Sequence, residues 1–148
     1  MVTNLSFEFG SADTLERVAA EVSRHASFLR FEDGAPAYDS IVLHTNDKPT
    51  IEDFITDSFR AVLSRFDGDG IYKIEDGKHK LLFFLPDFDN DLFPATKDEI
   101  LRYVVLSTTA SRLMQRSFGE YAKMVSMEAD ASLNRAITFL RTRIFPIE

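Results

Sequence analysis

The stretch IYKIEDGKHKLLFFL, residues 71–85, decides the fold class, because it interrupts a chain whose pattern is otherwise mostly helical. Two runs of strand-forming residues flank the pair Asp76-Gly77. Such a pair between two such runs is the commonest signature of a tight hairpin, since both central residues of the turn need positive φ. We therefore expect a β-hairpin at about 71–85.

Helical periodicity lies on both sides of this hairpin. Apolar residues recur at helical spacing from Asp13 to about Arg30, and again from Thr50, whose hydroxyl can cap the second helix. Downstream, Thr96 and Glu99 have the spacing of a capping box. A long helical region is therefore expected over about 97–142.

The region 97–142 contains one point at which it can divide. Ser117 and Glu120 form a second capping-box pattern, which favours two helices with a very short break. Gly119 can equally lie inside one kinked helix, at a cost of about 1 kcal/mol relative to alanine. Both alternatives stay open at this point.

Two further segments have strand-like sequences. LSFEF (residues 5–9) alternates apolar and polar residues, and SIVLH (residues 40–44) is a short apolar run. A chain of 148 residues is long enough for one domain that buries roughly 70% of its unfolded surface. We predict a single domain over residues 1–148, mainly α with a small β component, in which a helical bundle carries an inserted β-hairpin.

Composition excludes several classes of protein. The chain has no cysteine, which removes disulfides, thiol catalysis and cysteine-based metal sites. No apolar run reaches the ~20 residues of a membrane span, and the first residues lack the basic start and apolar centre of a signal peptide. We therefore expect no membrane partner and a cytoplasmic location at synthesis.

The net charge of −7 is unevenly distributed along the chain. Residues 1–96 have a balance of −9, whereas residues 97–148 have a balance of +2. This polarity suits head-to-tail contact between copies, although solvated faces of different charge explain it equally well. Direct nucleic-acid readout is disfavoured, because phosphate contacts need a concentrated basic surface.

The acidic segment DFDND, residues 87–91, has three alternating carboxylates: Asp87, Asp89 and Asp91. A calcium loop of the EF-hand kind needs glycine at its sixth position and glutamate at its twelfth, where this chain has Leu92 and Asp98. We therefore interpret the segment as a turn that leads into a helix. A less regular divalent site remains the alternative here, and a weaker one at DGDG, residues 67–70.

No catalytic or cofactor-binding residues are predicted. The three histidines, His25, His44 and His79, have no metal-ligand spacing, and His25 is interpreted as a satisfied residue at the edge of the core. The six glycines form no phosphate-binding loop, and no GxSxG motif is present. We expect a non-enzymatic protein without a cofactor.

Arginines supply the candidate contact residues. Arg112 and Arg116 are four residues apart on one helix face, and Arg141 and Arg143 flank the end of the last helix. They form either a solvated surface or an interface stripe that faces an acidic neighbour. The methionines are interpreted first as core residues and second as an adaptable contact surface: Met114, Met124 and Met127.

The order of elements over residues 50–142 resembles that of the head–tail connector (adaptor) proteins of tailed bacteriophages. The resemblance rests on TIEDFITDSFRAVLSRF (50–66), then the hairpin, then TKDEILRYVVLSTTASRLMQRS (96–117). It implies a non-enzymatic virion subunit that forms a homo-oligomeric ring through helix contacts, with portal and tail proteins as partners. The alternatives are a bacterial protein-interaction or regulatory module, and a binder of a small ligand or divalent metal.

Overall fold

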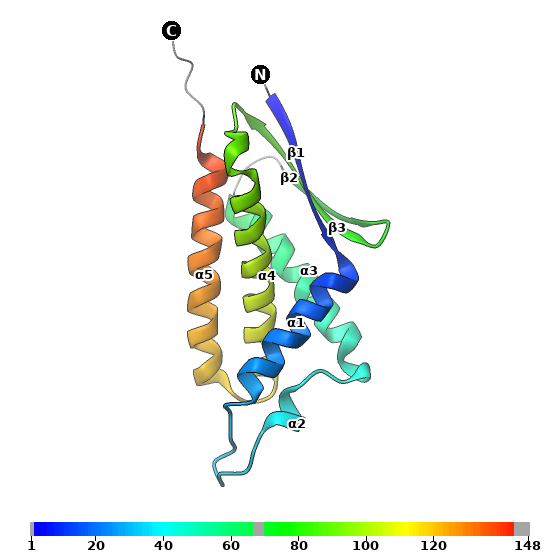
Figure 1. The fold of residues 1–148 in the computed structure, drawn as a ribbon, viewed down its shortest axis with the longest axis vertical. Helices are drawn as coiled ribbons and strands as arrows, with labels where there is room; N and C mark the ends of the chain where they lie inside the picture. The colour runs from blue at the N-terminus through cyan, green and yellow to red at the C-terminus, as the bar shows by residue number, and fades with distance from the viewer. Residues whose placement is uncertain (1, 67–69, 144–148) are drawn as a thin grey trace.

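The computed structural model describes residues 2–66 and 70–143, and helices dominate it (Figure 1). The long helices are α1 (Ser11–Ala26), α3 (Lys48–Phe66), α4 (Phe93–Gln115) and α5 (Gly119–Arg141). The short helical turns are α2 (Tyr38–Ile41), η1 (Thr45–Asp47) and η2 (Asn90–Leu92). The strands β1 (Val2–Gly10), β2 (Gly70–Glu75) and β3 (Lys78–Pro86) form one antiparallel sheet. The predicted class, mainly helical with a small β component, is confirmed.

The predicted hairpin is present, together with its predicted turn. Asp76 and Gly77 join β2 to β3, with φ of 54° and 71°. Both residues lie in the left-handed region that a tight hairpin turn requires. The turn chemistry read from the sequence therefore fixes the register of these two strands.

The hairpin is not an isolated insertion, because β1 joins it. β1 pairs with β3 along its whole length, from Val2 opposite Pro86 to Gly10 opposite Lys78. The order of strands is β1-β3-β2. The strand predicted at residues 5–9 is thus confirmed, and it extends the hairpin into a three-stranded sheet.

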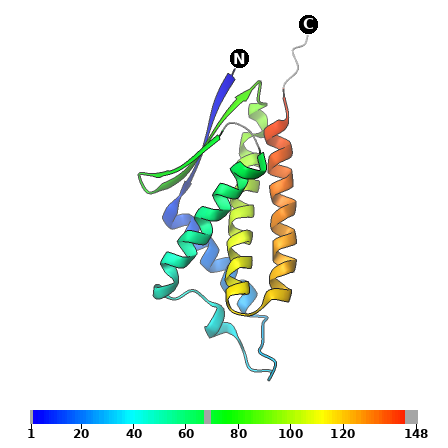
Figure 2. The ribbon, with the colours of Figure 1, turned by 180° about the vertical axis from the view of Figure 1, so that it is seen from behind.

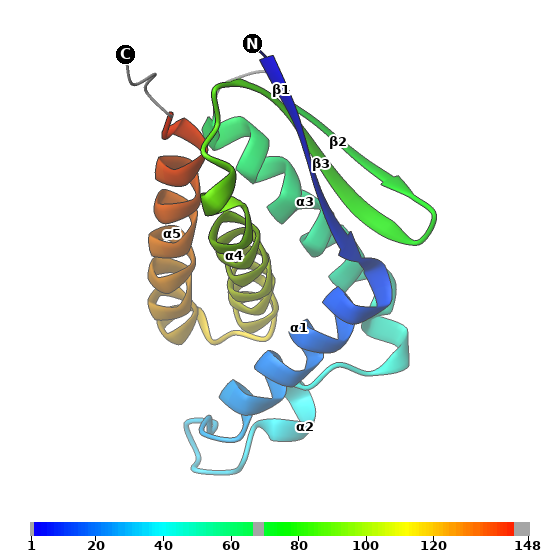
Figure 3. The same cartoon turned by 45° about the horizontal axis from the view of Figure 1, so that its top comes forward.

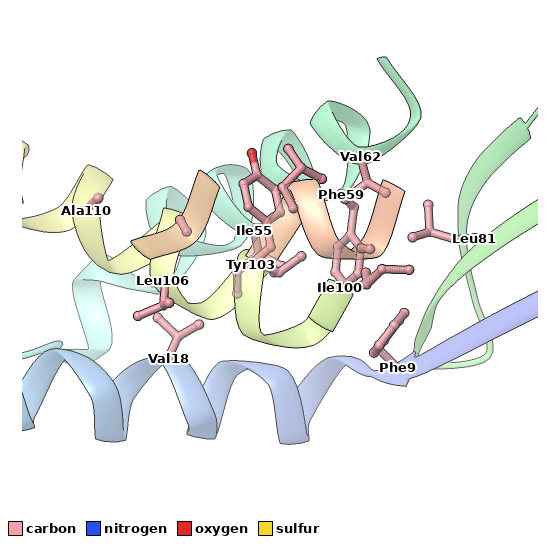
Figure 4. Packing of buried hydrophobic residues seen from close by; sticks show 14 of the residues in the cluster. Phe9, Val18, Ile55, Phe59, Val62, Leu81, Ile100, Tyr103, Leu106 and Ala110 are labelled. Atoms are coloured by element: carbon pink, nitrogen blue, oxygen red, sulfur yellow. The ribbon is translucent and has the colours of Figure 1, made fainter. Parts of the chain in front are cut away.

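One face of the sheet packs against the helices. Figure 4 shows Phe9 of β1 and Leu81 of β3 pointing toward Phe59 of α3 and Ile100 of α4. The ring of Phe7 stacks on that of Phe93 at the start of α4, with 4.5 Å between centroids. Phenylalanine therefore forms much of the joint between sheet and bundle.

Helix α4 is the central element of the bundle. It runs antiparallel to α5 and is also flanked by α1 and α3 (Figures 1 and 2). Its small residues Thr108, Thr109 and Ala110 are buried, and the hydroxyl oxygen of Ser58 on α3 lies 3.5 Å from that of Thr108. Short side chains on α4 thus permit the close approach of α3.

The C-terminal helical region consists of two helices with a short break, which confirms the first of the two predicted alternatives. Ser117 adopts φ of 71°, and the N–H of Phe118 donates to the Leu113 carbonyl at 2.9 Å. The N–H of Ser117 also donates to the Met114 carbonyl, which completes a Schellman motif. The capping box predicted at Ser117 and Glu120 is absent. The N-cap of α5 is Phe118, which makes no side-chain cap, and Ser117 belongs to the turn that ends α4.

The predicted helix starts at Thr50 and Thr96 were also wrong. α3 begins at Lys48 and α4 at Phe93, so prolines occupy their first turns, where the missing N–H would have no helical partner. The Thr96 hydroxyl lies within α4 and donates to the Leu92 carbonyl at 2.7 Å. α1 stops at Ala26 rather than near Arg30.

The strand predicted at residues 40–44 is absent from the structure. The segment forms the end of α2 and then an irregular connection. Its carbonyls at Ser40, Ile41 and Val42 accept hydrogen bonds from arginine side chains, not from a neighbouring strand. Of the DGDG segment, residues 67–69 lie outside the described residues, and Gly70 begins β2.

Candidate protein-contact surfaces

Arg112 is an internal clamp and not part of a surface stripe. Its side chain is fully buried, and its Nη2 lies 3.0 Å from Oδ2 of Asp47. Nε donates to the Ile41 carbonyl at 2.8 Å, and Nη2 donates to the Val42 carbonyl at 2.9 Å. Both the predicted interface role and the solvated-surface alternative are therefore wrong for Arg112. Its charge holds the connection before α3 against α4.

The other candidate arginines also bond to carbonyls of their own chain. Nε of Arg116 donates to the Ser40 carbonyl at 2.6 Å, close to the Arg112 clamp. Nη2 of Arg141 donates to the Phe66 carbonyl, and Nη1 of Arg143 donates to the Leu140 carbonyl. Arg112 and Arg116 thus lie together, whereas Arg141 and Arg143 lie at the opposite end of α4 and α5. The four residues do not form one continuous stripe.

The acidic segment forms the predicted turn. Asp87 adopts φ of 52°, and the Asp89 carboxylate accepts a hydrogen bond from the N–H of Asp91 at 3.1 Å. This contact is the local side-chain capping that favours aspartate in turns. Within residues 2–66 and 70–143, no group of three or more histidines and carboxylates is arranged to hold a metal ion.

Two buried histidines have hydrogen-bond partners. Nδ1 of His25 lies 2.8 Å from the Tyr121 hydroxyl, which agrees with its interpretation as a satisfied residue. Nδ1 of His79 lies 2.7 Å from the Tyr72 hydroxyl, and its ring stacks on that of Phe59. Burial lowers the pKa of His79. Both residues join packed elements: His25 links α1 to α5, and His79 links β3 to β2.

The outer face of the sheet is uncovered. Figure 3 shows the sheet on the side of the bundle away from α5, with helices against one face only. Ile71 on β2 and Phe84 on β3 are 49% and 38% exposed there. Cross-strand pairing places Leu82 of β3 beside Ile71 of β2, so an apolar area extends across these two strands and ends at Ser6 of β1. Exposed apolar residues that cluster in this way are typical of contact surfaces.

Charged residues form the neighbouring part of the same face. Lys80 on the central strand lies opposite Glu8 of β1 and opposite Lys73 of β2. Nζ of Lys80 lies 3.7 Å from Glu8 and 3.1 Å from Glu75. The hydrogen bond from Lys80, followed by that from Lys73, whose Nζ lies 3.2 Å from Glu75, lowers the pKa of Glu75. The outer face therefore has an apolar part around Ile71 and an ionic part around Lys80.

The methionines lie on the surface, and their first interpretation as core residues was wrong. Met114, Met124 and Met127 are 61%, 64% and 72% exposed. Met124 and Met127 project from the side of α5 opposite its buried residues. Unbranched thioether side chains adapt their shape to a partner, which suits a contact surface.

A groove of about 580 Å³ lies between α1, α4 and α5. Its apolar lining comes from Ala20, Leu101, Val105 and Leu106. Three arginines and three carboxylates also line it: Arg17, Arg24, Arg102, Glu21, Asp98 and Glu128. Because the opposite charges balance, the groove does not have the character of an anion site.

Sequence reasoning missed the residues of the sheet face. Ile71, Leu82 and Phe84 belong to runs that were recognised as strands, but their outward direction follows from the pairing with β1 and the packing of the opposite face. In the structure, buried and exposed residues alternate along β3, and this alternation identifies the side chains that point outward.

None of the helices in the described chain is both long and apolar enough to cross a membrane. Comparison of the chain with models of protein families, with curated proteins and with solved structures finds no match.

Proposed function

We propose that this protein is a non-enzymatic assembly subunit, whose work is to bind further copies of itself and other proteins. The observation that carries the proposal is the uncovered outer face of the sheet, where Ile71 and Phe84 are exposed. A small sheet packed on one face normally presents polar residues on the other. Apolar residues at these positions therefore favour a partner that covers them.

The distribution of exposed apolar residues supports the same proposal. Methionine and aromatic residues are enriched in protein interfaces, and here they occur on the sheet and on the far side of the bundle. Met124 and Met127 belong to α5 and Phe84 belongs to β3, and Figure 3 shows α5 and the sheet on different sides of the bundle. A subunit with neighbours on more than one side needs such an arrangement.

The kind of assembly is proposed on the resemblance to phage head–tail connectors. The helical hairpin α4–α5 beside a projecting sheet supports it, because those connectors are helical bundles whose insertions reach neighbouring subunits. Portal and tail proteins are the further partners under this proposal, and the virion is the place of function. A protein-interaction module outside a virion would use the same surfaces with other partners.

Native mass in solution tests the proposal. Light scattering over a wide range of protein concentration is expected to give a discrete oligomer whose fraction rises with concentration. Sedimentation in the presence of moderate salt checks that the association is not a long-range charge effect. A monomer at every concentration would contradict self-assembly.

A further inference from the structure

Both edges of the sheet are open in the part of the chain that the structure describes. Over residues 2–66 and 70–143, β1 and β2 each pair with β3 and with no other strand. No backbone hydrogen bond joins residues 5–9 or 71–74 to any other described segment. Backbone groups at a sheet edge must bind either water or another strand.

β1 lacks the features that normally protect an edge strand. It has nine residues, an unbroken register against β3, no proline and no lysine. Its one charged residue is Glu8, whose carboxylate lies on the outer face. Natural proteins block exposed edges with lysine, proline, bulges or a covering segment. An unprotected edge of this length is a template for a further strand.

The two edges can accept each other from different copies. Because β1 and β2 both run antiparallel to β3, they run parallel to one another. β1 of one copy can therefore pair in parallel with β2 of the next, and the outer face stays continuous. Such a contact joins two different surfaces of the same chain, and repetition of it closes into a ring when the rotation allows.

The charges on the outer face favour this pairing. Lys73 and Lys80 lie directly opposite each other on β2 and β3, and like charges in this arrangement are unfavourable. Lys73 lies 3.2 Å from Glu75 of its own strand, and among the described residues no further strand lies on its other side. In the joined sheet, Glu8 of the next copy falls in the same row and adds a second carboxylate beside Lys73. One row further along, Ser6 of that copy falls beside Ile71.

We propose that the protein assembles edge to edge, with β1 of one copy paired in parallel with β2 of the next and Glu8 beside the neighbour's Lys73. This inference rests on the proposed self-assembly and names the surfaces that perform it. It replaces the contact between helices that the sequence suggested.

Disulfide cross-linking tests the register directly, because the natural chain has no cysteine. The double variant Ser6→Cys/Ile71→Cys places thiols on β1 and β2. Within one copy β3 separates them by roughly 9–10 Å, beyond the ~7 Å limit for a disulfide. Between paired edges the strands are about 4.8 Å apart. Oxidation is therefore expected to give a ladder of covalent oligomers on a non-reducing gel.

The single variants Ser6→Cys and Ile71→Cys are the matched controls, and each is expected to stay monomeric on the same gel, because only unlike edges meet. A covalent dimer that forms efficiently from Ser6→Cys alone would show β1 pairing with β1. That result would overturn the proposed contact between β1 and β2.

Charge reversal tests the pairing in the absence of a cross-link. Glu8→Lys and Lys73→Glu each place like charges together at the edge and are expected to shift association several-fold to higher concentration. When the two variants are mixed, every contact between unlike copies joins opposite charges. The changed β1 of Glu8→Lys meets the changed β2 of Lys73→Glu, and the two unchanged edges meet each other. The mixture should recover the wild-type mass, and failure to recover it would overturn the Glu8–Lys73 contact.

The outcomes separate this inference from the proposed function. A wild-type oligomer whose mass is unaffected by the charge reversals, with no ladder from the double cysteine variant, overturns the edge pairing and leaves self-assembly standing. A wild-type monomer at every concentration that also gives no ladder overturns both.

Discussion

The guanidinium of Arg112 lies 3.0 Å from the carboxylate of Asp47, although 65 positions separate the two residues in the chain. Arg112 also donates to the carbonyls of Ile41 and Val42. The connection between α2 and α3 has no strand or helix partner for these groups. One buried side chain on α4 therefore takes the place of regular secondary structure there.

Removal of the Arg112 side chain is expected to destabilise the fold strongly. Arg112→Met leaves the Ile41 and Val42 carbonyls without this donor and Asp47 without its cation, although Asp47 is 23% exposed and keeps the hydrogen bond from His44. Each buried polar group left unpaired costs about 1–3 kcal/mol. Urea denaturation measures the change in the free energy of unfolding. The exposed Arg116→Ala variant, which loses a single carbonyl bond, is expected to change it by about 1 kcal/mol or less. Equal changes in the free energy of unfolding for the two variants would show that Arg112 does not hold the connection against α4.

Acid is expected to weaken the same contact. A hydrogen bond from the backbone N–H of His44 holds the pKa of Asp47 below its ordinary 3.8, and the charge of Arg112 acts in the same direction. The folded state therefore binds this proton less readily than the unfolded state. The stabilisation is fully present above pH 3.8 and is lost as pH falls through the lower folded pKa.

Asp47→Asn isolates this effect. The difference in unfolding free energy between the wild type and this variant should narrow as pH falls below 3.8. Urea midpoints at a series of acidic pH values measure it. A difference that stays constant with pH would show that the ionisation of Asp47 is not involved.

A second loss of stability is expected at milder acidity. Burial lowers the pKa of His79 below its ordinary 6.5, so the unfolded chain takes up this proton first. The contribution of His79 to the free energy of unfolding should be constant above pH 6.5. It should decrease as pH falls from 6.5 to the lower pKa that His79 has in the folded state.

His79→Phe keeps an aromatic ring against Phe59 and removes the proton. Thermal unfolding followed across this pH window should show a flatter profile for His79→Phe. Tyr72→Phe is the matched control: it removes the hydrogen bond to His79 but leaves the histidine, so it should retain the acid-dependent loss.

Two glycines are expected to respond to alanine with opposite sign. A Cβ at Gly77 or at Gly119 would meet no atom within 4 Å, so packing does not distinguish them. Gly77 has φ of 71°, where alanine is strained by about 1 kcal/mol. Gly119 begins α5 without positive φ, and alanine there should stabilise by about 0.4–1 kcal/mol. Melting temperatures of the two variants should move in opposite directions, and a shared direction would contradict the assigned backbone geometry.

Features set by neighbouring residues were predictable from the sequence. The Asp76-Gly77 turn, the helical stripes and the possible break near Ser117 all depend on interactions within a few residues, and the structure contains them. Helix starts were less accurate because two signals competed. At α3 and α4 a proline in the first turn marks the start, and the threonine that resembled a cap lies inside the helix.

Features set by distant residues were not predictable in this way. The pairing of β1 with β3 joins residues 68 positions apart at Gly10–Lys78 and 84 apart at Val2–Pro86, and it determines which side of the hairpin is exposed. Arg112 gave no local sign of burial, because its partners are carbonyls of a connection that resembled a strand. The methionines misled in the opposite direction, since hydropathy favours the core and carries no information on which face of α5 is covered.

Substitutions on two exposed apolar surfaces are expected to show which surface carries the contact between copies. Ile71 lies on an edge strand of the sheet, whereas Met127 is an exposed residue of α5. Figure 3 shows α5 on the side of the bundle away from the sheet. Substitutions at such exposed positions normally change stability by no more than about 0.5 kcal/mol, so both variants should fold. Ile71→Asp places an additional charge at the proposed contact and should lower the native mass at a given concentration. Met127→Asp should leave that mass unchanged. Light scattering on the two variants, with circular dichroism to verify folding, makes the comparison. If Met127→Asp dissociates the oligomer and Ile71→Asp does not, the subunits meet through α5, and helix contacts, not sheet edges, hold the assembly together.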